Sequence, residues 1–144
     1  MQDLDFVVHV FQTAYIENIV EDRSKDSSPK DNQQDADFYR RKTMQLRYIA
    51  VRTRPDILLD TVVLSSRMKD PSTSDIATVR RIISYLYNTR MFALTFRGGV
   101  IDAWGCTDAS FNSYENGRGH TGILFFLDKH SAAVLAKSMS HKVV

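Results

Sequence analysis

The chain has 144 residues, which fits one domain with its own hydrophobic core. Hydrophobic residues make up 43% and charged residues 25%, which excludes a collagen-like, fibrous or wholly disordered chain. The single cysteine, Cys106, excludes an internal disulfide framework. No apolar run exceeds five residues, and Asp3 and Asp5 interrupt the basic start of a signal peptide. We therefore expect an intracellular protein with no membrane partner.

The net charge of +2 conceals a strong segregation along the chain. Residues 1–37 carry three basic and nine acidic side chains, whereas residues 38–97 carry twelve basic and four acidic ones. Residues 98–144 hold four of each sign. A basic block of this kind indicates a polyanionic partner, although a solvated charged face is the commoner explanation for any single arginine.

The N-terminal third combines one apolar segment with one polar segment. Residues 6–20 are apolar and compatible with strand or helix, becoming helical from Thr13 onward. Ser24–Asp37 contains no large apolar residue and is rich in Ser, Asp, Asn and Gln. Because such a segment cannot bury enough surface to order itself, residues 24–37 are predicted to be a flexible linker.

Helical patterns fill the middle of the chain. Residues 38–54 form a helix with apolar side chains on two faces, which predicts packing on both sides; the faces hold Met44, Tyr48 and Val51, and Phe38, Leu46 and Ile49. The proline that follows ends this helix. A second helix is predicted over residues 57–68, and a third begins at a capping box of Ser72 and Asp75 and continues to about Thr89.

The C-terminal part changes to strand composition. Strands are predicted over residues 91–97, 100–109, 120–127 and 131–137, with short connections that favour an antiparallel meander. Helices followed by strands predict an α+β arrangement.

Three arginines are candidates for nucleic-acid contact. Arg40, Arg47 and Arg54 recur every seven residues, so on a continuous helix they form one stripe with steps of about 10 Å. Guanidinium groups at such intervals suit contacts to a phosphate backbone. The alternative is a solvated face whose arginine stems cover apolar neighbours.

Asp108 is the candidate for metal chemistry. It ends an apolar strand, where a half-buried carboxylate is costly unless it is paired, hydrogen-bonded or bound to a cation. The alternative is an ordinary aspartate at a strand end that faces a turn.

Several short motifs combine into a family resemblance that covers nearly the whole chain. They are Gln12-x-x-Tyr15-Ile16, Tyr39-Arg40, Leu46-x-Tyr48-Ile49-Ala50, Thr53-Arg54-Pro55-Asp56-Ile57, Leu64-Ser65, Arg81-Ile82-Ile83, Tyr85-Leu86, Gly105-x-x-Asp108-Ala109 and Arg118-x-x-Thr121-Gly122. In this order and spacing the sequence resembles copia-type retrotransposon Pol polyproteins, from the end of the reverse transcriptase palm into the ribonuclease H domain.

The resemblance implies a helical post-palm segment followed by a partial ribonuclease H-like fold, with three antiparallel strands of an incomplete mixed sheet. The implied divisions are the end of the polymerase region (1–23), the linker (24–37), a helical connection region (38–97) and a truncated N-terminal part of the ribonuclease H domain (98–144).

The implied function is binding of an RNA–DNA hybrid and, in a complete protein, hydrolysis of its RNA strand by two Mg²⁺ ions. Asp108 would be the one catalytic, metal-binding carboxylate of an incomplete site, so we expect the chain alone to be inactive. The implied partners are the hybrid, or another nucleic acid, and the remainder of the polyprotein, in a cytoplasmic virus-like particle or in the nucleus. Two alternatives stay open: a non-enzymatic nucleic-acid-binding or structural remnant of such an element, and a protein-interaction module whose basic face meets an acidic partner, such as residues 1–37.

Overall fold

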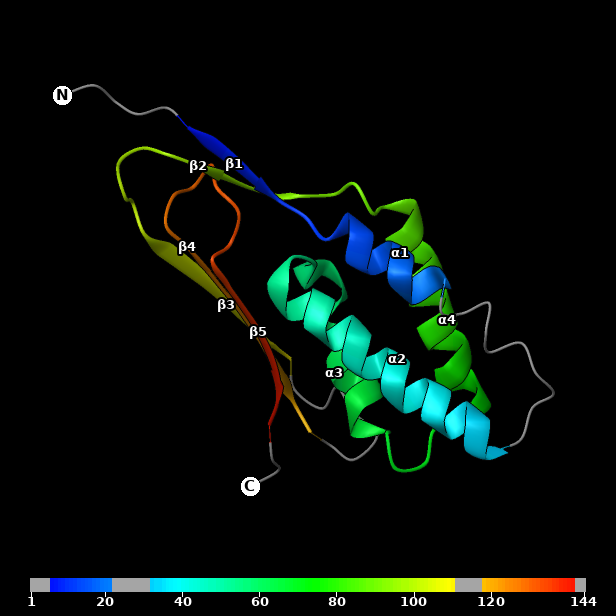
Figure 1. Ribbon diagram of the computed structural model, residues 1–144. Coiled ribbons are helices and arrows are strands. Elements are labelled where there is room, and N and C mark those ends of the chain that lie inside the picture. The colour runs from blue at the N-terminus through cyan, green and yellow to red at the C-terminus, as the bar shows by residue number, and fades with distance from the viewer. Residues whose placement is uncertain (1–5, 22–31, 111–117, 142–144) are drawn as a thin grey trace. The chain divides into compact units, whose positions relative to one another are not determined.

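The computed structural model describes residues 6–21, 32–110 and 118–141 (Figure 1). The chain divides into two compact units, a helical unit over Phe11–Phe92 and a strand unit that combines Met1–Val10 with Ala93–Val144. The described residues contain four α-helices and two antiparallel sheets. The predicted α+β class is therefore confirmed.

The helical unit is built around α2 (Asn32–Arg52), which begins inside the segment predicted to be a linker. Residues 24–31 of that prediction lie outside the described residues, but residues 32–37 are helical. Leu46 and Ile49 on α2 are fully buried, and the Tyr39 hydroxyl donates a 2.7 Å hydrogen bond to the carbonyl of Leu64. Burial of this face, rather than helix propensity, provides most of the driving force for α2.

α1 (Thr13–Glu21) packs against this unit with a polar contact at its C-terminal end. Lys42 of α2 is fully buried, and its Nζ donates a 2.9 Å hydrogen bond to the carbonyl of Ile19 in the last turn of α1. The last four carbonyls of a helix have no partner within the helix, and a cation there also interacts favourably with the helix dipole. Lys42 therefore stabilises the end of α1 from inside the core.

The chain breaks after α2 at the proline, as predicted. Arg54 takes a non-helical conformation (φ −130°, ψ 66°) before the 3₁₀ turn η2 (Pro55–Ile57), which leads directly into α3 (Leu58–Ser66). The steric demand of a proline ring on the preceding residue explains this conformation.

α4 (Thr73–Asn88) begins with the predicted capping box. The Ser72 hydroxyl accepts a hydrogen bond from the backbone N–H of Asp75, and the Asp75 carboxylate accepts one from the backbone N–H of Ser72, at 3.2 and 3.0 Å. Arg67, directly after α3, donates a 2.7 Å hydrogen bond to the other carboxylate oxygen of Asp75. This aspartate therefore fixes the start of α4 and ties it to the end of α3.

The strand unit contains two separate antiparallel sheets. β1 (Val7–Val10) pairs with β2 (Leu94–Arg97), so the ambiguous segment 6–20 contains a strand followed by a helix. β3 (Trp104–Ser110), β4 (His120–Phe126) and β5 (Leu135–Ser140) form the predicted meander in the order β3-β4-β5. β3 and β5 each start four residues later than predicted, and Ala132 and Val134 instead bond to the carbonyls of Thr95 and Phe125.

None of the helices within the described ranges has both the length and the apolar character needed to cross a membrane.

The capping box yields a test of stability. We expect Ser72→Ala to lower the free energy of unfolding by about 1 kcal/mol, because the side chain that satisfies an N-terminal amide is lost. Burial raises the pKa of Asp75, but the hydrogen bonds from Ser72 and Arg67 outweigh it and hold this pKa below its ordinary value. Because the folded-state pKa is the lower one, Asp75 stabilises the fold fully above about pH 4, and this stabilisation is lost as the pH falls through the folded-state pKa.

Urea unfolding followed by circular dichroism between pH 3 and 7 measures the effect of the substitution and the effect of pH. The variant should show a smaller loss on acidification, and an unchanged pH profile would contradict this role of the capping box.

Candidate functional site

Arg54 joins three segments of the helical unit although its side chain is only 3% exposed. Its Nε and Nη2 donate to the Asp56 carboxylate, with a shortest distance of 2.7 Å. Its Nη1 and Nη2 also donate to the carbonyl and the hydroxyl of Thr89, at 3.1 and 2.8 Å. The rings of Tyr85 and Phe92 lie 5.2 and 5.5 Å from the guanidinium. Every face of the guanidinium is therefore occupied by groups of the same unit.

Asp56 connects this arginine to the helix α4. Its carboxylate also accepts a 2.8 Å hydrogen bond from the Tyr85 hydroxyl. Burial raises the pKa of Asp56, but the hydrogen bonds from Arg54 and Tyr85, together with the charge of Arg54, outweigh it and lower this pKa. Asp56 is thus an anion at neutral pH whose charge is largely compensated by Arg54.

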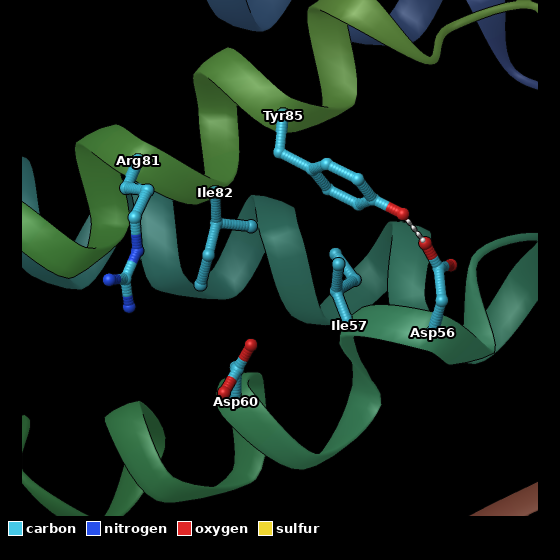
Figure 2. Close-up of a pocket in the computed structure, with 6 residues that line it drawn as sticks. All are labelled: Asp56, Ile57, Asp60, Arg81, Ile82 and Tyr85. Carbon is cyan, nitrogen blue, oxygen red and sulfur yellow. Dashed lines mark hydrogen bonds between the residues drawn. The ribbon is translucent and has the colours of Figure 1, made fainter.

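A pocket of about 330 Å³ lies next to this network, between the α3 and α4 segments of the chain. Figure 2 shows the residues that line it, which are Asp56, Ile57, Asp60, Arg81, Ile82 and Tyr85. Ile57 and Ile82 are buried and give the pocket an apolar wall, whereas Asp60 and Arg81 are exposed. Among the interactions of the described residues, no ion pair joins Asp60 to Arg81. The pocket therefore presents one carboxylate and one guanidinium beside an apolar surface.

A second surface feature runs along α2. Met44, Tyr48 and Val51, which we call the α2 stripe, follow each other at helical spacing and are 56%, 48% and 55% exposed. The sequence predicted that this face packs against another element, but about half of each of the three side chains is exposed, and the ring contact to another helix is made by Tyr48. The ring of Tyr48 contacts Tyr15 at 5.2 Å between centroids and lies under the guanidinium of Arg52 at 5.8 Å.

The structure separates the three arginines that the sequence placed on one stripe. Arg40 and Arg47 lie on the exposed face of α2, where Arg40 pairs with Asp37 at 3.4 Å. Arg54 follows the end of α2 and is turned into the core. A seven-residue spacing places side chains on one face only while the helix continues, and this helix ends first.

Asp108 lies on β3, an edge strand of the meander, opposite Gly122 on β4, and is exposed. No three His, Cys, Asp or Glu side chains come together in a possible metal site anywhere in residues 6–21, 32–110 and 118–141. Within these ranges, Asp108 has no companion ligands for the two-ion chemistry that the resemblance implied. Binding of Mg²⁺ at Asp108 stays a prediction.

Five of the six pocket residues, all except Asp60, lie in the short motifs, but the resemblance that those motifs carry gave none of them a role in a site. Asp56 and Asp60 are one helical turn apart, as are Arg81 and Tyr85, so each pair lies on one face of its own segment. These two spacings show that each pair shares one face of its segment. They do not show that the two faces, which are separated by about 25 residues of chain, lie opposite each other.

The site thus belongs to an α+β protein whose helical unit carries an open pocket and an exposed helix face. No protein-family model and no solved structure matches the chain. A curated protein, the secreted RxLR effector protein 161 of Plasmopara viticola, is 34% identical over 83 residues. The match covers 56% of this chain and 58% of the relative, so the chain is similar to little more than half of that effector.

This similarity corrects the identification made from the motifs. The relative is a secreted effector, which overturns the retrotransposon reverse transcriptase and ribonuclease H family, the function built on it, and the nucleic-acid and polyprotein partners. It also contradicts the intracellular, virus-like-particle or nuclear location. A leader is absent from any mature secreted chain, so the lack of one in a sequence does not assign a compartment.

The structure gives a physical reason why the motifs misled. The run Thr53-Arg54-Pro55-Asp56 is the point where α2 ends and its polar groups are satisfied internally, with Thr53 donating a 2.8 Å hydrogen bond to Gln12. Tyr39, from another motif, likewise bonds to the backbone of α3. Residues with such folding roles do not report an activity.

The role of Arg54 can be tested by stability. We expect Arg54→Ala to cost about 3 kcal/mol of unfolding free energy, because the buried guanidinium leaves a cavity and the Thr89 carbonyl and the half-buried Asp56 carboxylate lose their charged donor. Arg54→Lys should recover part of this loss, since an ammonium cannot reproduce the two-oxygen contact. Arg47→Ala is the matched control and should change stability by less than about 0.5 kcal/mol. Urea unfolding measures all three, and equal effects of Arg54→Ala and Arg47→Ala would contradict the assignment.

Proposed function

We propose that the protein is a secreted effector that acts by binding a protein of the organism to which it is delivered. The similarity to a secreted effector supports the class. The observation that carries the binding mode is the α2 stripe. Its three exposed apolar side chains lie at helical spacing on a helix whose opposite face is buried in the core.

The composition of the α2 stripe resembles the centre of a protein–protein interface. Aromatic residues, methionine and arginine are enriched in such interfaces, and a tyrosine near the centre is a common source of binding energy. Tyr48 is held between Tyr15 and Arg52, so little side-chain entropy remains to be lost on binding. The stripe is therefore a preorganised anchor.

Charge selects the kind of partner. Exposed arginines border the stripe on the same helix: Arg40, Arg41, Arg47 and Arg52. The partner that complements this pattern is an amphipathic helix with an apolar stripe and acidic flanks, laid along α2. Such a helix would bury the α2 stripe and place carboxylates beside the arginines.

The proposal predicts that Tyr48→Glu strongly weakens partner binding, because it removes the anchor and adds a charge that repels acidic flanks. Tyr87→Glu is the matched control, since Tyr87 is also an exposed tyrosine with an arginine guanidinium over its ring, at 4.5 Å. Proteins from an extract of the target organism that the unmodified protein and Tyr87→Glu retain, and Tyr48→Glu does not, are then produced in pure form and titrated by calorimetry. We expect Tyr48→Glu to weaken direct binding about 30-fold or more, the loss of about 2 kcal/mol typical of an anchor residue.

Three outcomes would contradict the proposal. One is that no purified protein distinguishes the two variants. A second is that the distinguishing partner binds through a basic or neutral surface. A third is that sedimentation shows a dimer of this chain which Tyr48→Glu dissociates, since the stripe would then be a self-association surface.

The secreted class has a separate test. Antibody detection in the producing organism should find the protein in the extracellular fluid. Retention of the whole pool inside the cells would contradict secretion without touching the binding result.

A further inference from the structure

The stretch from η2 through α3 to Arg67, which we call the α3 segment, faces α4 through three pairs of polar side chains. The two outer pairs are hydrogen-bonded, whereas the side chains of the pair between them are not joined. Asp56 bonds to Tyr85 at one end of the series, and Arg67 bonds to Asp75 at the other, at 2.8 and 2.7 Å. The two segments therefore run in opposite directions, which Figure 2 also shows. Asp60 lies one turn beyond Asp56, and Arg81 lies one turn before Tyr85, so these two opposite charges belong to the same level of the series.

At the position of Asp60 and Arg81 the pocket lies where an ion pair between the two helices could form. The pair one turn away, Asp56–Tyr85, and the pair about two turns away, Arg67–Asp75, are closed by direct hydrogen bonds, whereas among the described residues no ion pair joins Asp60 to Arg81. A direct pair between two such exposed side chains would contribute little to stability. Both groups are thus available to a ligand that offers a better arrangement of charges.

We propose that this pocket binds a free α-amino acid with a small apolar side chain, whose ammonium group lies against Asp60 and whose carboxylate lies against Arg81. This site is separate from the α2 stripe and does not depend on the proposed partner binding.

The chemistry of the lining selects such a zwitterion. The planar guanidinium of Arg81 matches the two oxygens of a carboxylate, and the Asp60 carboxylate accepts from an ammonium group. Asp56 is already compensated by Arg54, so the remaining pocket charges are one of each sign. A phosphate would be repelled by Asp60, and a simple cation would leave Arg81 unused.

The apolar wall and the size complete the fit. Ile57 and Ile82 offer an aliphatic surface for a side chain such as that of leucine or valine. A volume of about 330 Å³ is at the lower end of the range for small-molecule pockets, which suits one amino acid better than a nucleotide.

Calorimetric titration of the full chain with L-leucine tests the proposal. Two analogues separate the charges, since N-acetyl-L-leucine lacks the ammonium group and L-leucinamide lacks the carboxylate. We expect a Kd of about 1 mM or tighter for leucine, and at least about tenfold weaker binding for each analogue.

Variants locate the binding. Asp60→Asn and Arg81→Gln should each weaken leucine binding at least about tenfold, with unchanged thermal unfolding because both side chains are exposed. Arg80→Gln is the control, because Arg80 is the next residue on α4 but lies over the ring of Phe38 and near Asp35. It should bind leucine like the unmodified protein.

Each other result overturns the proposal. If leucine produces no saturable heat, or if Arg80→Gln weakens binding as much as Arg81→Gln, the pocket is not the site. Equal binding of L-leucinamide would make it a cation site, and equal binding of N-acetyl-L-leucine would make it an anion site. None of these results bears on secretion or on the α2 stripe.

Discussion

The buried guanidinium of Arg54 is the interaction on which the helical unit depends. Pro55 forces the chain out of helical geometry at this residue, and a helix that ends in a core leaves carbonyls without partners. Arg54 supplies donors to η2 and to the end of α4, while Thr53 bonds to the segment before α1. One short turn therefore connects segments from all four helices.

This arrangement changes the meaning of the charge at residue 54. Buried charges are tolerated only when they are paired and fully hydrogen-bonded, which the contacts to Asp56 and Thr89 achieve. The same pairing leaves Asp56 nearly neutralised at the edge of the pocket. The charge that the pocket presents to a ligand then comes from Asp60 and Arg81, for which the described residues contain no ion pair.

The sequence predicts well what local rules determine. The break before Pro55, the capping box of Ser72 and Asp75, and the antiparallel meander each depend on neighbouring residues, and all three are present. It predicts poorly what depends on distant segments. Two apolar faces on α2 correctly identify a helix, but only packing decides that Leu46 is buried and Met44 is exposed. The pocket likewise arises from two helix faces whose pairing no local pattern contains.

The segregation of charge along the chain has a structural counterpart that the sequence alone could not supply. Acidic residues of the first 37 positions pair with arginines of the following block, at Glu17–Arg90, Asp35–Arg80 and Asp37–Arg40. Further basic side chains of that block, Lys42, Arg54 and Arg67, are used to end or connect helices. Several of the twelve basic side chains of residues 38–97 are thus paired or hydrogen-bonded within the helical unit. Arg47 and Arg52 of the same block border the α2 stripe, where exposed apolar side chains lie between basic ones. A partner that used charge alone would gain little there, whereas one that combines acidic flanks with an apolar stripe would use both.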